Sequence, residues 1–310
     1  MGQPRLREVE KQEILDLPML VLTLLLTALG LMMIYSSSYA RALYESGDSG
    51  YYFKRQLLFA LLGTGAMLAV SRVRPQLIRK LAFPVLGVSV VFLVLVFVPG
   101  IGRSENGATR WVSMGISFQP SEVAKLGIIL SFAALISAFG EKMETFRWGI
   151  APFGAILAVI VVLLRLEPHN SAIVIIVCTA GAMLFLGGVK YRWFILGGCA
   201  MLLGLVLILG AGGYEASRIT AWRDPFSDPT DDGYQIIQSL YAIGSGGLFG
   251  LGFGQGRQKY LYLPEEHNDY IFSIVCEELG LVGAAAILLL YALLILRGYW
   301  ISMHIRDRFL

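Results

Sequence analysis

Charged residues are scarce in this sequence, at 15% of its 310 residues where soluble proteins have about a quarter. Apolar residues make up 56%, and both values argue against a soluble globular fold. Cysteine and histidine are also rare, with three of each. The cysteines lie in apolar segments, which argues against a disulfide framework, and no Cys/His pair has the spacing of a zinc site.

Other binding motifs are missing as well. The glycine-rich run 244–256 lacks the G-x-G-x-x-G order and the strand–helix context of a dinucleotide site. It is either a flexible loop, which we favour, or a set of backbone amides that cradle a phosphate. The acidic run 224–232 does not match a calcium loop, so we assign no metal and no organic cofactor, and a divalent cation is not indicated. The net charge of +3 gives no case for nucleic acid as a partner.

Long uncharged stretches dominate the chain. A helix that crosses roughly 30 Å of hydrocarbon needs about 20 mostly apolar residues. The fourth stretch reaches that length only by including Lys125, and the eighth only by including Glu277 and Glu278. The eight stretches are 17–40, 56–71, 81–102, 126–140, 148–164, 168–189, 193–214 and 279–296.

Basic residues gather in the segments that a cytoplasmic N-terminus would place inside the cell, which predicts an N-in, C-in topology. We therefore expect an all-α polytopic membrane protein with about eight transmembrane helices, forming one integral membrane domain over 1–310. The first stretch is too long for a signal peptide and is interpreted as a retained span. A long extracytoplasmic loop, about 212–268, joins spans seven and eight and contains Lys259 among its basic residues.

Polar residues collect in the external segments. Pro120 suits the first turn of a helix, and Glu122 and Lys125 then lie on one helical face. They are either an ion pair that neutralises itself at the membrane boundary or part of a polar cavity, since charges at membrane depth usually line one. Arg110 and Trp111 could equally be an interfacial anchor.

Asp269 begins the last apolar segment, with Glu277 and Glu278 about two turns deeper. An isolated Asp at this place is most simply explained by capping or by the helix dipole. The deeper pair is interpreted as structural, with hydrogen bonds to neighbouring helices.

Taken together, these segments resemble the SEDS family, the bacterial cell-shape and division proteins FtsW, RodA and SpoVE. The run that starts at Trp222 is more similar to FtsW and SpoVE than to RodA. The matching stretches follow the family order through nearly the whole chain: 35–38, 54–56, 106–111, 118–125, 222–229, 233–235, 238–239, 263–272 and 277–280.

The resemblance implies a peptidoglycan glycosyltransferase that polymerises lipid II, an undecaprenyl-pyrophosphate-linked disaccharide peptide, into glycan strands. It implies an active site at the outer face of the bacterial plasma membrane, with the division septum as one location. The implied partners are a class B penicillin-binding transpeptidase and other membrane proteins of the divisome or elongasome.

The resemblance places the family's catalytic acid on Asp269, which we interpret as the general base that deprotonates the acceptor hydroxyl. Preplaced cations would stabilise the leaving pyrophosphate, and Glu122 would orient Lys125. The residues expected to bind the pyrophosphate and the sugar are Arg110, Trp111, Glu122, Lys125 and Arg218.

Three departures from the family pattern stand out. His169 occupies the position of a family Asp, whose role therefore cannot be transferred, and Asn268 replaces the commoner Thr. Family members usually have ten spans, so the chain is expected to lack the last ones. Two alternative functions stay open: a transporter that flips lipid II, and a non-catalytic scaffold for a transpeptidase.

Overall fold

The structure is a computed structural model that describes residues 15–105, 108–113, 115, 117–199, 220–231, 233–305, 307 and 309–310. It consists of two compact units. The first comprises Met1–Arg72 and Leu207–His304, and the second comprises Val73–Val206 and Ile305–Leu310.

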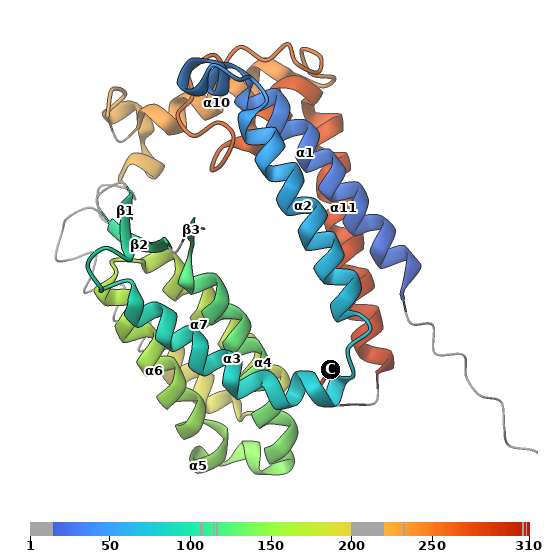
Figure 1. Ribbon diagram of the computed structural model, residues 1–310, viewed down its shortest axis with the longest axis vertical. Helices are drawn as coiled ribbons and strands as arrows, with labels where there is room; N and C mark the ends of the chain where they lie inside the picture. Colours follow the sequence, from blue (N-terminus) through green and yellow to red (C-terminus); the bar gives the residue numbers. More distant parts are fainter. Residues whose placement is uncertain are drawn as a thin grey trace, which may run out of the picture. The chain divides into compact units, whose positions relative to one another are not determined.

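The first unit is built on three long helices, α1 (Leu17–Ser46), α2 (Tyr51–Val70) and α11 (Ile271–His304). Helix α1 packs against both α2 and α11 (Figure 1). A shorter helix, α10 (Tyr234–Gly246), packs against α11, and the 3-10 turn η2 (Pro225–Ser227) precedes it. The predicted extracytoplasmic loop therefore contains a helix of its own.

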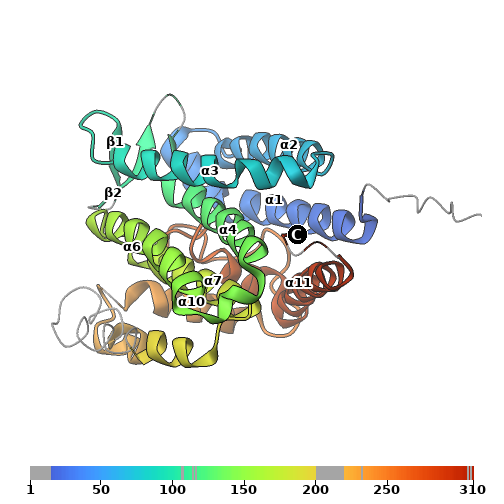
Figure 2. The same ribbon diagram turned by 90° about the horizontal axis from the view of Figure 1, so that it is seen from below.

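The second unit is a helical bundle, in which α4 lies against α3 and α7, and α7 against α6 (Figure 2). Its buried core includes Phe132 and Phe153, whose rings meet edge to face at 4.8 Å. The helices of this unit include α3 (Pro75–Leu95), α4 (Pro120–Phe139), η1 (Gly140–Glu144), α5 (Phe146–Gly149), α6 (Ala151–Leu166) and α7 (Asn170–Leu186). The described residues 191–199 are helical as well.

The membrane prediction is confirmed in its coarser form. Six helical segments of the described chain are long and apolar enough to cross a bilayer: Leu17–Ser46, Tyr51–Val70, Pro75–Leu95, Pro120–Glu144, Phe146–Leu166 and Ile271–His304. Helix α7, with 17 residues, is shorter, and most of the predicted span 193–214 lies outside the described residues. The count of eight spans and the N-in, C-in topology stay predictions.

The all-α prediction needs one correction, in the segment that connects the end of α3 to the start of α4. Strands β1 (Gly102–Glu105), β2 (Ala108–Ser113) and β3 (Ser117–Phe118) form an antiparallel sheet in the order β1-β2-β3. This segment is too short and too polar to span a membrane, and the β-branched and aromatic side chains of β2 favour an extended chain. Val112 is the fully buried side chain of this strand.

Helix α11 is broken at Gly280, whose φ of 67° and ψ of −170° are not helical. Glycine adopts this positive φ without the steric cost that a side chain brings. Segment 247–252 pairs with the backbone on both sides of the break and replaces the missing helical hydrogen bonds. The bonds run from Leu251 N to Glu277 O (2.9 Å), Gly252 N to Glu278 O (3.0 Å), Leu281 N to Gly247 O (2.9 Å) and Val282 N to Leu248 O (3.1 Å).

This close packing gives a test of the fold. A Cβ on Gly246 would overlap the carbonyl oxygen of Cys276, whereas a Cβ on Gly244, in the same helix, would meet nothing within 4 Å. We predict that Gly246→Ala destabilises the protein by ~1–3 kcal/mol, as overpacking does, and that Gly244→Ala does not. Melting temperatures in one detergent measure both variants. Equal values would contradict the pairing of α10 with α11.

Candidate active site

Two buried carboxylates organise the loop that leads to α11. Glu277 and Glu278 are 1% and 0% exposed, and charges buried so deeply require hydrogen-bond partners. Glu277 accepts hydrogen bonds from the backbone amides of Arg257 (2.7 Å) and Gln258 (3.3 Å). Glu278 accepts one from the amide of Gly254 (2.9 Å). The glycine-rich run is therefore an ordered loop held by acids, which corrects the expectation of a flexible one.

Glu278 also has a buried cation as its partner. Lys259 is 3% exposed, and its Nζ lies 2.7 Å from Glu278 Oε1. Ser36 on α1 donates its hydroxyl to Glu278 Oε2 at 2.7 Å. These contacts support the interpretation of the deep acids as structural. They also show that Lys259 is a buried counterion, a role that no local pattern indicated.

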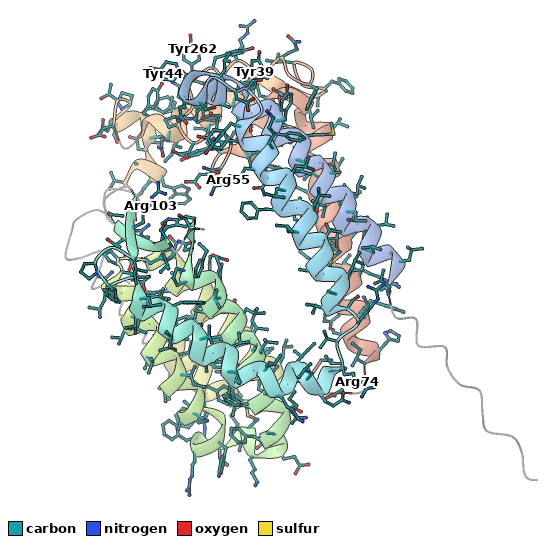
Figure 3. The ribbon with its side chains drawn as sticks, viewed as in Figure 1. Tyr39, Tyr44, Arg55, Arg74, Arg103 and Tyr262 are labelled. Carbon is teal, nitrogen blue, oxygen red and sulfur yellow. The ribbon has the colours of Figure 1, made fainter. Side chains whose placement is uncertain are left out.

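A second ion pair joins α1 to the same loop. Arg41 donates from Nε and Nη2 to the carboxylate of Glu266, at 2.9 and 2.7 Å. Burial alone would raise the pKa of Glu266, but the imidazole of His267 and the guanidinium of Arg41 hold this pKa below its usual value. The ring of His267 lies on Tyr52 of α2, with 4.4 Å between centroids. The loop is thus fixed to α1 and α2 of its unit. Figure 3 labels Tyr39 of α1 and Tyr262 of the loop, which lie at the same end of this unit.

Asp269 lies on a tight turn directly before α11. Glu265, with a φ of 52°, accepts hydrogen bonds through its carbonyl from the amides of Asn268 (3.1 Å) and Tyr270 (3.3 Å). Its carboxylate also accepts one from the side-chain amide of Asn268 (2.9 Å). Asp269 itself is exposed, and across the described ranges its carboxylate has no hydrogen bond or ion pair. It therefore makes no capping hydrogen bond to α11 within the described residues, and the explanation by the helix dipole stays open.

Arg110 lies on β2 in the second unit. Its Nη2 donates to the carbonyl oxygen of Pro168 at 2.6 Å, while its buried Nε has no acceptor in the part of the chain that is described. Trp111 is the next residue of the strand and is paired in register with Arg103 of β1. The register shifts between Arg103 and Ser104, which pair with Trp111 and Thr109, so Arg110 is the extra residue of a β-bulge, where the ladder is interrupted.

Lys125 and Glu122 lie in the first turns of α4, which begins at Pro120 as predicted. Lys125 Nζ is 2.7 Å from Glu122 Oε2, so the predicted pair on one helical face is also confirmed. The Lys125 side chain is 27% exposed and that of Glu122 is 60% exposed. A pair this close to water contributes little to stability, and its cation is accessible to an anion.

His169 connects these residues. Its Nε2 lies 3.4 Å from the side-chain nitrogen of Gln119. Burial lowers the pKa of His169, and the positive charges of Arg110 and Lys125 lower it further, against the opposing effect of Glu122. The three predicted residues therefore act on one imidazole, which places them in one polar neighbourhood.

Glu167 is a member of this neighbourhood that the sequence did not single out. It is 2% exposed, and neither carboxylate oxygen has a hydrogen-bond partner among the described residues. Burial raises its pKa to about 7, although the positive charge of Arg110 acts in the opposite direction. The only sequence signal was its place between two apolar stretches, 148–164 and 168–189.

The predicted site residues thus fall into two groups. Arg110, Glu122 and Lys125 belong to the polar neighbourhood of the second unit, and Asp269 belongs to the first unit. Arg218 lies outside the described residues. One group contains an exposed carboxylate without a partner among the described residues, and the other contains two cations.

Comparison with known proteins adds an independent observation. A family model for FtsW, RodA and SpoVE, described as "Cell cycle protein", matches residues 16–310. The chain belongs to this family. The resemblance seen in its motifs is therefore confirmed.

Relatives of the FtsW/RodA/SpoVE family agree with it over almost the whole chain. The chain is 38% identical to "Probable peptidoglycan glycosyltransferase FtsW" of Trichlorobacter lovleyi, over 95% of the chain and 77% of the relative. It is 39% identical to "Stage V sporulation protein E" of Bacillus subtilis, over 94% of the chain and 80% of the relative.

Solved structures of family members share the fold. One, described as "Structural coordination of polymerization and crosslinking by a peptidoglycan synthase complex", matches with a TM-score of 0.75 and 26% identity, over 95% of this chain and 80% of that one. The rod shape determining protein RodA of Thermus thermophilus matches with a TM-score of 0.65 and 25% identity, over 95% of this chain and 77% of its own.

The buried pair of Lys259 and Glu278 leads to a prediction for stability. Lys259→Met leaves a buried carboxylate without its cation, which typically costs ~3–5 kcal/mol. The double variant with Glu278→Gln removes both charges and should recover part of the loss. Lys54→Met is the control, because the Lys54–Asp48 pair is exposed and such pairs contribute ~1 kcal/mol or less. Thermal unfolding in detergent measures all three, and equal losses for Lys259→Met and Lys54→Met would refute the pairing.

Proposed function

We propose that this chain is a peptidoglycan glycosyltransferase that polymerises lipid II into glycan strands, with Asp269 as its general base. Relatives that are 38% and 37% identical to it carry the name peptidoglycan glycosyltransferase. The observation that carries the proposed site is the free, exposed carboxylate of Asp269, held on a turn by Glu265 and directly followed by α11.

Polymerisation forms a bond between an acceptor hydroxyl oxygen and the anomeric carbon of a donor sugar. The bond between that carbon and the lipid pyrophosphate breaks, and the hydroxyl proton must leave. A carboxylate without an internal partner is free to accept it, provided that the hydroxyl comes within hydrogen-bond distance. The carboxylate of Asp269 has no such internal partner, since its oxygens have no hydrogen bond or ion pair over the described ranges.

The leaving pyrophosphate gains negative charge as its bond to the sugar breaks. Cations that are already in place stabilise this charge more in the transition state than in the ground state. Arg110 and Lys125 are our candidates in the second unit, and Glu122 keeps the Lys125 ammonium in position at 2.7 Å. Arg218 joins them on the family resemblance alone. Trp111, the residue after Arg110 on β2, is likewise assigned to substrate binding on the family resemblance alone.

The proposed reaction uses no organic cofactor. The lipid part of the substrate would stay in the bilayer, which accounts for a sugar-joining enzyme built from membrane-spanning helices. We place it in the bacterial plasma membrane, with its site at the outer face and the division septum as one location.

The proposed partner is a class B penicillin-binding transpeptidase, which crosslinks the strands that this chain would make. The structural relative described as part of a peptidoglycan synthase complex supports it, since that description joins polymerization with crosslinking. Other membrane proteins of the divisome or elongasome are further candidates.

Asp269→Asn tests the proposed base. The amide keeps the size of the side chain but is a far weaker base, and loss of a general base typically lowers the rate ~100- to 10,000-fold. Polymer formation from purified lipid II, read by gel, measures the loss. The control is Asp231→Asn, another exposed acid of the same unit.

The same assay decides between the open functions. Polymerisation consumes lipid II, whereas a transporter conserves it and a scaffold leaves it unchanged. Normal polymer from Asp269→Asn would remove Asp269 from the mechanism, and the absence of polymer from the wild-type chain with its transpeptidase would refute the proposed function.

Lys125→Met tests the cation site. Loss of its positive charge should slow polymerisation at saturating lipid II, because the developing charge on the pyrophosphate loses a partner. Lys80→Met is the control, since Lys80 is an exposed lysine of the same unit, on α3. Equal rates for the two variants would argue against a specific pyrophosphate site at Lys125.

A further inference from the structure

Cations and indole rings gather where α4 and the η1 turn meet α5 and the segment after α7. Lys142 Nζ and Arg147 Cζ lie 5.7 and 5.6 Å from the ring centroid of Trp148. Arg192 Cζ lies 5.2 Å from that of Trp193. The ring centroids of Phe146 and Trp193 are 5.1 Å apart, and this contact joins the group around Trp148 to the group around Trp193. We call Lys142, Arg147, Trp148, Arg192 and Trp193 the basic–aromatic cluster.

The cations of this cluster are exposed and have no acidic partner within the described part of the second unit. The two nearest acids in sequence are Glu141 and Glu144, and Glu144 is already paired with Lys190 at 2.9 Å. The candidate spans Pro120–Glu144 and Phe146–Leu166 meet at this point, so the cluster lies at a membrane boundary. Cations in such a place are available to an anion at the depth of lipid headgroups.

An apolar cavity begins at the same place. It has a volume of about 470 Å³, within the ~300–1,000 Å³ of small-molecule sites, and it is lined by Ile150, Gly154, Leu157, Gly181, Trp193 and Phe194 among others. Trp193 belongs to both the cavity and the cluster. A Cβ on Gly154 or Gly181 would meet nothing within 4 Å, so these glycines keep the cavity open.

We infer that the basic–aromatic cluster and this cavity together bind one anionic phospholipid, with its phosphate at Lys142, Arg147 and Arg192 and an acyl chain in the cavity. Neither feature alone requires this ligand. A headgroup without a chain would need no cavity, and a neutral lipid would need no unpaired cations. Their contact through Trp193 matches a molecule with a charged end and an apolar end.

The simpler alternative is an aromatic and basic belt that anchors the helices in any membrane. A belt of this kind would not distinguish an anionic headgroup from a zwitterionic one, and it would be indifferent to the volume of the cavity. These two differences define the experiment.

Native mass spectrometry of the purified full chain in detergent measures retention of phosphatidylglycerol and of phosphatidylcholine with the same acyl chains. We expect selective retention of phosphatidylglycerol, about fivefold weaker in Arg147→Gln and in Arg192→Gln, from the ~1 kcal/mol that one basic residue contributes near an anionic surface. Arg74→Gln, at the exposed arginine directly before α3 that Figure 3 labels, should not change it. Equal retention of both lipids, or no loss in the two variants, would overturn the proposal.

A separate variant tests whether the cavity holds the acyl chain. Gly181→Leu should fill the cavity and reduce phosphatidylglycerol retention, whereas Gly63→Leu, at an equally open glycine of α2, should not. Undiminished retention by Gly181→Leu would overturn the proposal. So would displacement of the lipid by inorganic phosphate, because the bound species would then be a free anion.

A second measurement leaves the cavity unchanged. Cys178 lines the cavity and is exposed, whereas Cys276 is buried. In a Cys199→Ser chain, N-ethylmaleimide should therefore react mainly with Cys178. Phosphatidylglycerol should slow that reaction several-fold, and phosphatidylcholine should not. Equal rates with the two lipids would count against the site even if Gly181→Leu failed to fold.

Discussion

The first unit depends on the need to neutralise Glu278, a fully buried carboxylate inside a helix that is apolar enough to span a membrane. Its partners come from two places: Ser36 lies on α1, and Lys259 and the amide of Gly254 belong to the loop before α11. These bonds bring the glycine-rich run back against α11. The break at Gly280 then exposes backbone groups that the same run satisfies. Glu278 and the neighbouring Glu277 thus hold this loop together.

That loop ends at the turn that presents Asp269. The Arg41–Glu266 pair fixes the turn to α1, and the positive φ of Glu265 reverses the chain just before α11. A carboxylate that is to act as a base must be held in place without being consumed by a partner. Here the neighbouring acids make the structural contacts, which leaves Asp269 exposed. Glu265 and Glu266 therefore hold the turn in place, and Asp269 is left available for the proposed reaction.

Features that depend on nearby residues could be predicted from the sequence. Apolar stretches predicted the long helices, Pro120 the start of α4, and the spacing of Glu122 and Lys125 their ion pair. Each follows from helix geometry over one or two turns.

Partners that are distant in the chain could not be predicted in this way. Ser36 and Glu278 are 242 residues apart, and Arg41 and Glu266 are 225 apart. No local periodicity records such pairs, so Lys259 looked like an ordinary loop cation and the glycine-rich run like a flexible loop. The strands between α3 and α4 were missed for a related reason, since an analysis of span lengths says little about short segments between spans.

Glu167 gives the second unit a sensitivity to the acidity of its surroundings. Its pKa of about 7 lies above the ordinary value of a glutamate because burial favours the neutral acid. Between the two values the folded chain holds a proton that the unfolded chain has released, so folding becomes less favourable as pH rises through that interval. A mildly acidic medium therefore favours this part of the molecule, and an alkaline medium leaves a buried negative charge that Arg110 offsets only in part.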